Sequence, residues 1–167
     1  MKHTSIIELH KDFFDFSAGH FTIFSECDRE NLHGHNYHVG MVLHFDVGDT
    51  GINFDYRVYK EKLREILKRL DQTTLIATQS PHSKIDVDGD LVYVHFNGEK
   101  IPFLKRDVTL LDISNTTVEE ISNWILQQFI DDQKSIAEHQ IEKIEVKVYS
   151  NLSQAGSSCW VRKEGCY

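Results

Sequence analysis

Alternation of apolar and polar residues predicts strands toward both ends of the chain. The segments that alternate with a period of two are 5–21, 36–46, 141–150 and 158–163. In the first of them, Phe16, Ala18 and His20 fall on one face of the expected strand. A polar loop that carries Cys27 separates the first segment from the second.

Helical spacing of apolar residues predicts two helices between these pairs of strands. The segment from Tyr56 to Leu70 places its apolar residues three or four positions apart, and Asp55 is a suitable N-cap. A second helix is expected from Thr117, where Thr117-Val118-Glu119-Glu120 has the spacing of a capping box. The expected order is strand, strand, helix, helix, strand, strand.

Residues 85–112 interrupt that order. Leu91–Phe96 and Ile101–Leu104 are apolar stretches on either side of Asn97-Gly98, a strong signal for a tight hairpin turn. Pro102 would place its strand at a sheet edge. We therefore expect a β-hairpin inserted between the two helices.

Composition limits the class of protein. The chain has 167 residues, of which 40% are hydrophobic and 26% charged, as expected for one globular domain over 1–167. A formal charge of -8 argues against a nucleic-acid partner. We expect no membrane partner, since no signal peptide or transmembrane run is recognisable. Three cysteines without a Cys-x-x-Cys pair favour a reducing, cytoplasmic location.

Three histidines indicate a candidate metal site. His33 and His35 are two residues apart, so in a strand their side chains point to the same side. His20 could supply a third ligand from an adjacent antiparallel strand. Three imidazole ligands leave one zinc position open to water or substrate, which is typical of catalytic zinc. The alternative is that a His-x-His pair is incidental in a chain with ten histidines.

The sequence resembles the 6-pyruvoyltetrahydropterin synthase family, which includes the 6-carboxytetrahydropterin synthases of queuosine biosynthesis. The similarity runs from about Phe14 to Lys163 and is interrupted at 78–113. Its most specific motifs are Phe16-Ser17-Ala18-Gly19-His20, Cys27 with His33-Gly34-His35-Asn36-Tyr37, and Gly51…Asp55-Tyr56…Lys60. Weaker support comes from Leu70-Asp71, Thr117-Val118-Glu119 and Val146-Lys147-Val148-Tyr149.

The resemblance implies an α+β tunnelling fold. That fold has a four-stranded antiparallel sheet with two helices on one face, to which this chain would add its inserted β-hairpin. In the family such sheets join into trimeric barrels, and the trimers often pair into hexamers. The active sites lie between subunits, so a homo-trimer or homo-hexamer is implied here.

The resemblance also implies an activity and its residues. Family members act as carbon-oxygen lyases on dihydroneopterin triphosphate, a small-molecule pterin, and eliminate triphosphate with the help of Zn2+. The metal ligands would be His20, His33 and His35. The catalytic residues would include Cys27 and Asp71, and the substrate-binding positions would be Thr117, Glu119 and Ser150.

Two positions depart from the family pattern. Gln72 follows Asp71 where the family has a histidine, and glutamine cannot transfer a proton near neutral pH. Ser150 stands where a glutamate usually holds the pterin, and it cannot offer the paired acceptors of a carboxylate. Either the alignment is shifted by a few residues, or the chain is a divergent paralogue with an altered substrate or reduced catalysis.

Glu30 offers a different catalytic base. Glu30-Asn31-Leu32-His33-Gly34-His35 resembles a branch of the family that uses Glu-x-x-His-Gly-His to make 6-hydroxymethyldihydropterin for folate. A partly desolvated glutamate beside zinc is a competent base. The alternative is that Glu30 is one of several charged residues on a solvated loop. His82 or His95, in the insertion, could also replace the missing histidine.

Three hypotheses follow for the function. The first is a zinc-dependent pterin synthase or lyase. The second is a zinc-binding paralogue that binds a different small heterocycle with altered or no catalysis. The third is a purely structural zinc module, which the open fourth ligand position disfavours.

Overall fold

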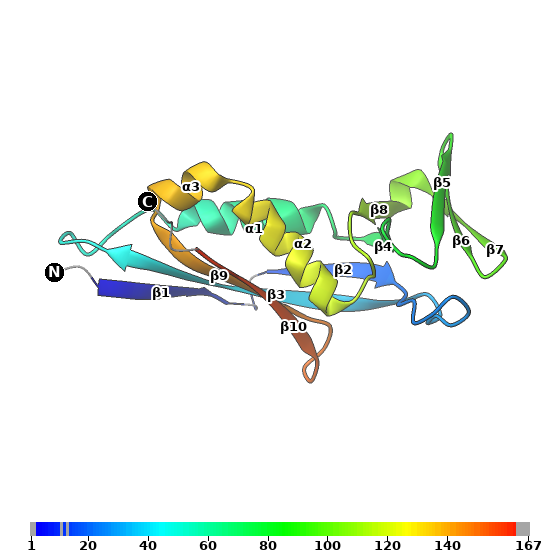
Figure 1. Ribbon diagram of the computed structural model, residues 1–167, viewed down its shortest axis with the longest axis horizontal. Coiled ribbons are helices and arrows are strands. Elements are labelled where there is room, and N and C mark those ends of the chain that lie inside the picture. Colours follow the sequence, from blue (N-terminus) through cyan, green and yellow to red (C-terminus); the bar gives the residue numbers. More distant parts are fainter. Residues whose placement is uncertain (1–2, 11, 13, 163–167) are drawn as a thin grey trace.

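A seven-stranded sheet forms the framework of the computed structural model, which describes residues 3–10, 12 and 14–162 (Figure 1). Its strands are β1 (His3–Leu9), β2 (Asp15–His20), β3 (His33–Val47), β4 (Thr73–Ala77), β8 (Val108–Leu111), β9 (Ile141–Tyr149) and β10 (Ala155–Val161). Their order is β10-β9-β3-β2-β4-β8, and β1 pairs with the second half of β3. The strands predicted at 36–46, 141–150 and 158–163 correspond to β3, β9 and β10, although Lys163 lies outside the described residues.

The strand predicted over 5–21 is two strands, β1 and β2, which lie end to end along β3. Leu9 pairs with Met41, and Asp15 pairs with His38. Six residue steps separate Leu9 from Asp15, but only three separate their partners on β3. β1 and β2 therefore cannot form one continuous ladder with β3, because the two chains advance by different numbers of residues between these pairs.

The sheet is larger than the four-stranded antiparallel sheet that we expected. Two short strands, β4 and β8, extend it beyond β2, and both of these pairings are parallel. In the sequence, β4 precedes and β8 follows the three inserted strands that span residues 84–104. Ala18 and Gly19 of β2 pair with Thr73 and Thr74.

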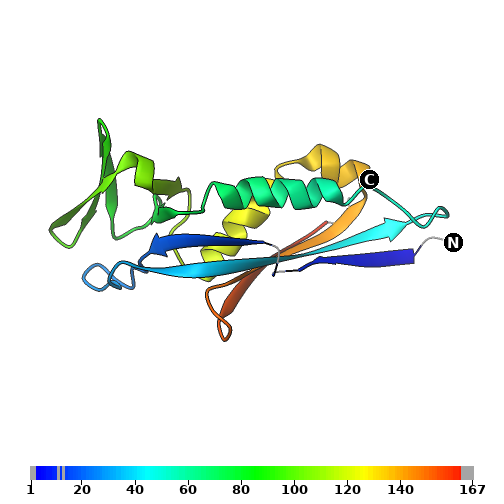
Figure 2. The same ribbon diagram turned by 180° about the vertical axis from the view of Figure 1, so that it is seen from behind.

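Three helices, rather than the expected two, cover one side of the sheet, and no described helix covers the other side (Figures 1 and 2). They are α1 (Arg57–Lys68), α2 (Val118–Ile130) and the short α3 (Gln133–Glu138). The predicted cap of α2 is confirmed, since the Thr117 side chain accepts a hydrogen bond from the Glu120 amide. At α1 the Asp55 carboxylate accepts from the Arg57 amide at 3.0 Å, although the helix itself begins one residue later than expected.

Burial of the apolar helix faces against the sheet forms the main core. On α1 the buried residues are Tyr59, Leu63, Ile66 and Leu67. They pack against the alternate residues of β3 that point to the same side, such as Val39, Met41 and Leu43. No described helix is both long and apolar enough to cross a lipid bilayer.

The insertion is a three-stranded antiparallel sheet at one end of the molecule (Figures 1 and 2). Its strands are β5 (Lys84–Asp88), β6 (Leu91–Phe96) and β7 (Glu99–Leu104), followed by a 3-10 turn over Lys105–Asp107. The predicted hairpin is confirmed, with positive φ at both Asn97 (44°) and Gly98 (77°), as a type I′ turn requires. β7 is an edge strand, as Pro102 predicts, and β5 is the addition that the pattern did not reveal.

Candidate metal centre

His20, His33 and His35 converge at the end of the helix-covered face of the sheet. His20 on β2 lies directly opposite His33 on β3, and the two-residue spacing brings His35 to the same side. One ligand nitrogen from each ring lies within 4.8 Å of the others. The structure thus brings together all three predicted ligands.

Two backbone carbonyls determine which ring nitrogen is available to a metal ion. His20 Nδ1 lies 2.9 Å from the Thr116 oxygen, and His33 Nδ1 lies 2.9 Å from the Asn31 oxygen. A carbonyl can only accept a hydrogen bond, so each Nδ1 carries the proton and each Nε2 has a free lone pair. Such contacts orient histidine ligands in metal sites.

The Nε2 atoms fit a metal ion. His20 Nε2 is buried and has no hydrogen-bond partner, which is costly for a polar atom unless a ligand completes it. His33 Nε2 and His35 Nε2 lie 3.0 Å apart. Two nitrogens bound to tetrahedral zinc at about 2.0–2.1 Å are about 3.3 Å apart, so a small adjustment would let both bind one ion.

Electrostatics keep two of the rings neutral, as metal ligation requires. Burial lowers the pKa of His20 below its ordinary value, and the nearby His33 and His35 lower it further against the opposing hydrogen bond to Thr116. Burial also lowers the pKa of His35. His33 is exposed, so the centre opens to solvent on its side.

Hydrogen bonds join Asn115 and Thr116, which precede α2, to the residues that follow β2. The Asn115 side chain accepts a hydrogen bond from the Ile23 amide (3.1 Å) and donates one to the Ile23 carbonyl (2.7 Å). The Thr116 hydroxyl donates to the Phe21 carbonyl at 2.8 Å. These bonds hold the Thr116 carbonyl against His20. Sequence reasoning missed both residues, because nothing in their type or spacing marks them.

Tyr37 closes the inner side of the centre. It is fully buried, its ring stacks on Phe16 at 4.8 Å, and it meets His20 and His35 edge-on at 5.9 and 5.5 Å. Burial raises the pKa of the Tyr37 hydroxyl, so it stays protonated at neutral pH. The Tyr37 ring thus packs against two of the three candidate ligands.

Glu30 lies where its charge acts on two of the three candidate ligand histidines. Its Oε2 accepts a hydrogen bond from the Thr22 amide at 2.8 Å. Burial alone would raise the pKa of Glu30, but hydrogen bonding from Thr22 and the charges of His33 and His20 hold it below its ordinary value. Glu30 is therefore ionised at neutral pH beside the candidate metal centre.

Cys27 is an exposed thiol on the same loop. Its Sγ lies 3.6 Å from the Ser25 hydroxyl, and its amide donates to that same oxygen. Among the described residues, its sulfur is not grouped with the three histidine ligands. The Cys27 role implied by the family resemblance stays a prediction.

Asp71 and Gln72 lie at the corner between α1 and β4. Asp71 Oδ1 accepts from the Ser17 amide at 2.8 Å, and the Gln72 amide donates to the Ser17 carbonyl at 2.7 Å. Gln72 has a positive φ of 57°. Within one chain Asp71 thus anchors β2, and its catalytic role stays a prediction.

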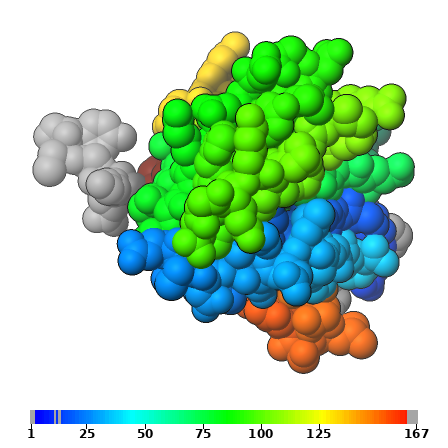
Figure 3. All heavy atoms as spheres, turned by 90° about the vertical axis from the view of Figure 1, so that its right-hand side faces the viewer, coloured from blue at the N-terminus to red at the C-terminus, as the bar shows by residue number. Residues whose placement is uncertain are grey.

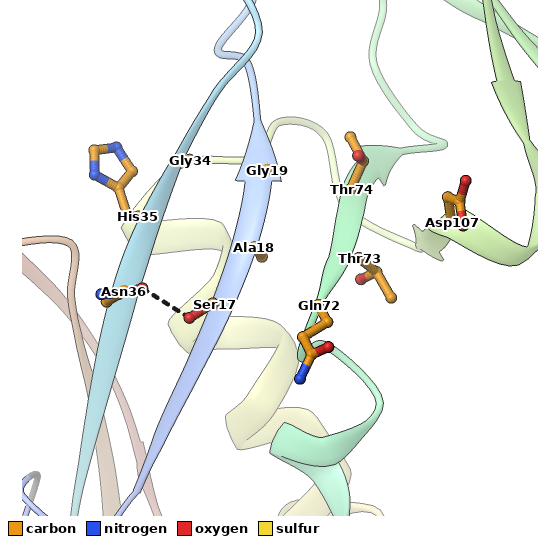
Figure 4. A pocket seen from close by; sticks show the side chains of 10 residues that line it. All are labelled: Ser17, Ala18, Gly19, Gly34, His35, Asn36, Gln72, Thr73, Thr74 and Asp107. Carbon is orange, nitrogen blue, oxygen red and sulfur yellow. Dashed lines mark hydrogen bonds between the residues drawn. The ribbon is translucent and has the colours of Figure 1, made fainter.

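A polar pocket of about 510 Å3 lies beside these residues (Figure 4). Alternation along β2 and β3 puts Ser17, Gly19 and Asn36 on the face opposite to the histidine side chains. In Figure 4 the His35 ring projects from β3, whereas Gln72 lies across β2 from it. Ser17, Gly19 and Asn36 therefore face away from the candidate metal centre, whereas His35 contributes both to that centre and to the lining of the pocket.

Two of the three predicted substrate-binding residues lie at the start of α2, and the third lies just after β9. Thr117 caps α2, and Glu119 has an exposed side chain. Ser150 directly follows β9 and is 8% exposed, and its hydroxyl donates to Gln154 at 3.4 Å. In the insertion, His95 Nε2 lies 2.9 Å from an Asp86 oxygen.

Comparisons with known proteins identify relatives over nearly the whole chain. A family model described as 6-pyruvoyl tetrahydropterin synthase matches residues 8–164. A Methanocaldococcus jannaschii protein, provisionally named 6-carboxy-5,6,7,8-tetrahydropterin synthase, is 25% identical over 140 residues, which is 83% of this chain and 85% of that protein. A Pyrococcus horikoshii protein with the same provisional name is 26% identical, covering 82% and 80% of the two chains.

Solved structures agree with this relationship. The 6-pyruvoyl tetrahydropterin synthase of Plasmodium vivax superimposes with a TM-score of 0.88 at 28% identity, covering 96% of this chain and 99% of that one. The Plasmodium falciparum enzyme gives 0.88 at 26% identity, with 95% and 99% covered. Two further Plasmodium vivax structures are of variants in which a glutamate, described as a catalytic residue, is replaced by alanine or by cysteine.

Proposed function

The chain belongs to the 6-pyruvoyl tetrahydropterin synthase family, and on that basis we propose that it is a zinc-dependent pterin synthase or lyase. Its substrate would be dihydroneopterin triphosphate or a related reduced pterin, from which it would eliminate triphosphate. The observation that carries this proposal is the convergence of three histidines with His20 Nε2 buried and unpartnered.

His20, His33 and His35 would hold the ion through their Nε2 atoms. Bound there, Zn2+ supplies a Lewis acid that polarises and acidifies hydroxyl groups on the pterin side chain. The carbonyls of Asn31 and Thr116 keep the rings in the tautomer that ligation needs. The exposed side of His33 leaves room for a substrate to approach.

Glu30 is the base that we propose for proton transfer. Its Oε2 is occupied by the Thr22 amide, so Oε1 is free to take a proton from the substrate side chain. The Plasmodium vivax relative has a glutamate described as a catalytic residue, which supports this choice over Cys27. Once the proton is removed, the electrons it leaves form a carbon-carbon double bond as the bond to the triphosphate oxygen breaks.

We propose that the protein works as a homo-trimer or homo-hexamer in the cytoplasm. The sheet has open edges at β1, β8 and β10 among the described strands, and its second face lacks a helical cover. Pairing of such edges with neighbouring copies would satisfy their backbone groups. Asp71 could then serve a neighbour's site, with Thr117, Glu119 and Ser150 holding the pterin.

A second candidate is favoured by Gln72 and Ser150. Neither can replace the histidine or the glutamate expected at its position, because an amide does not titrate and a hydroxyl lacks paired acceptors. A paralogue that keeps the metal but binds another small heterocycle, with altered or no catalysis, would explain both changes.

Incubation of the zinc-loaded protein with dihydroneopterin triphosphate tests the two candidates. We expect release of triphosphate together with a new pterin, and no release from His35→Ala, which lacks a ligand. Absence of both products from the zinc-loaded protein would contradict the first candidate. A heterocycle that raises the melting temperature without being turned over would then support the second.

A further inference from the structure

Arg29 connects the proposed base to the inserted sheet. It directly precedes Glu30, and its Nη1 donates a hydrogen bond to the Glu30 carbonyl at 2.8 Å. Its Nη2 forms an ion pair with Glu99 of β7 at 3.1 Å. Only 21% of the Arg29 side chain is exposed, so the guanidinium is held in place rather than free in solvent.

Two aromatic rings hold the same guanidinium. Its central carbon lies 5.4 Å from the centroid of Phe21, which follows β2, and 5.7 Å from that of Phe96 at the end of β6. Both rings belong to a second apolar cluster, separate from the main core, which joins the segment after β2 to the inserted sheet. Figure 3 shows the loop over 21–32 in contact with the insertion at this end of the molecule.

Glu30 depends on this loop for its orientation. Its amide donates to the Thr22 carbonyl at 2.9 Å, while its Oε2 accepts from the Thr22 amide. Arg29 itself pairs with Ile23 through an isolated antiparallel bridge. The Glu30 carboxylate is therefore placed by a short pair of antiparallel segments, Thr22-Ile23 and Arg29-Glu30, which we call the strap. Arg29 belongs to one of its two segments.

We propose that Arg29 is the positioning residue for Glu30, and that through it the inserted sheet is part of the catalytic apparatus. The inference rests on the proposed function in one respect, the role of Glu30 as base. Arginine suits the role because its planar fork can reach Glu30 and Glu99 at once while its faces lie against two rings. A lysine offers one nitrogen and cannot do all of this.

Arg29→Met tests the proposal by removing every polar contact while keeping an apolar side chain. Hydrogen exchange, measured on the metal-loaded protein, should be at least about tenfold faster at Thr22 and Glu30, with β3 and β9 unchanged, because the strap would open locally. With a pterin substrate, kcat should fall by about 10–100-fold with little change in KM, since misplacing a catalytic group has effects of that size. Metal content should stay the same.

Two further variants complete the experiment. Arg64→Met is the matched control, since the Arg64 guanidinium also lies over an aromatic ring, Phe14, but belongs to α1. It should leave exchange at Thr22 unchanged. Arg29→Lys keeps the charge, and we expect it to restore only part of the protection and of kcat. It also serves if Arg29→Met does not fold.

The exchange measurement is independent of turnover. If the wild-type protein turns over no pterin, the proposed function fails, while the exchange data still test whether Arg29 positions Glu30. Unchanged exchange at Thr22 and Glu30 in Arg29→Met would overturn the inference. Full recovery in Arg29→Lys would also overturn it, since charge alone would then suffice.

Discussion

His20 Nδ1 lies 2.9 Å from the carbonyl oxygen of Thr116, ninety-six positions later in the chain. The bond joins the end of β2 to the turn that precedes α2. It fixes the proton on Nδ1 and directs Nε2 toward the other two histidines. The proposed metal centre therefore depends on contacts beyond its three ligands.

Asn115→Ala should weaken metal binding without touching a ligand. The variant leaves both the amide and the carbonyl of Ile23 without their side-chain partner, so of the bonds that hold Thr116 against His20 only its own bond to Phe21 remains. Zinc affinity, measured by competition with a chelator, should fall by about 10–100-fold, as is usual for loss of a supporting residue. Asn53→Ala is the control, because Asn53 also holds a backbone carbonyl, that of His139, but beyond the far end of β3. Equal affinity in both variants would contradict the role of Asn115.

Loss of a ligand should have a larger effect. In His35→Ala two of three nitrogens remain, and zinc affinity should fall by at least about 100-fold, more than loss of a supporting contact. His44→Ala, on the same strand but outside the histidine cluster among the described residues, should bind zinc normally. One zinc per chain in the purified His35→Ala protein, measured by elemental analysis, would argue against the proposed ligand set.

Glu30→Gln and Cys27→Ala separate the two candidate bases. Both should keep zinc, since neither residue is a proposed ligand. Glu30→Gln should lower kcat by at least about 100-fold, the usual contribution of a general base. Cys27→Ala should stay within about threefold of wild type, because its thiol is exposed and bonded to Ser25. The reverse pattern would assign proton transfer to Cys27, as the family resemblance implies.

The metal-free protein should lose stability in mild acid. Burial lowers the pKa of His20 below 6.5, its ordinary value, so below that pH the unfolded chain binds a proton that the folded chain does not. The free energy of unfolding should therefore fall as the pH is lowered from about 7.5 to about 5.5, measured by urea unfolding in the presence of a chelator. His20→Gln should show a shallower dependence. Identical pH dependence in the two proteins would be inconsistent with the buried neutral imidazole.

A glycine allows β10 to lie against the start of α2. A Cβ at Gly156 would be 2.8 Å from the Glu119 amide nitrogen and 2.9 Å from the Val118 carbonyl carbon. Gly156→Ala should lower the free energy of unfolding by about 1–3 kcal/mol, the usual cost of overpacking. Gly48→Ala is the control, since a Cβ there meets nothing within 4 Å. Equal thermal stability of the two variants would contradict the close packing.

Local signals in the sequence predicted the parts of the fold that depend on neighbouring residues. The Asn97-Gly98 turn and the Thr117 cap are confirmed because each requires a particular residue type at a particular place. The break after Leu9 and the parallel strand pair β4 and β8 were not predicted. Those features depend on which distant segment supplies the backbone partner, and alternation alone does not contain that information.

The same distinction holds for the site. His33 and His35 are evident from their spacing. His20 was expected on an adjacent antiparallel strand, and the strand register places it opposite His33. Thr116 and Asn31 could not be identified, because they act through carbonyl groups that every residue type has. Whether Gln72 and Ser150 alter the chemistry depends on the ligand, and the sequence only shows that they depart from the family pattern.

A crystal structure of the zinc-loaded protein soaked with a reduced pterin tests the central claim most directly. We predict anomalous density for one zinc ion per chain, bound by Nε2 of His20, His33 and His35, with a pterin hydroxyl or water as the fourth ligand. The carboxylate of Glu30 should face the pterin side chain. Zinc at another position, or a fourth protein ligand that closes the coordination sphere, would contradict the account.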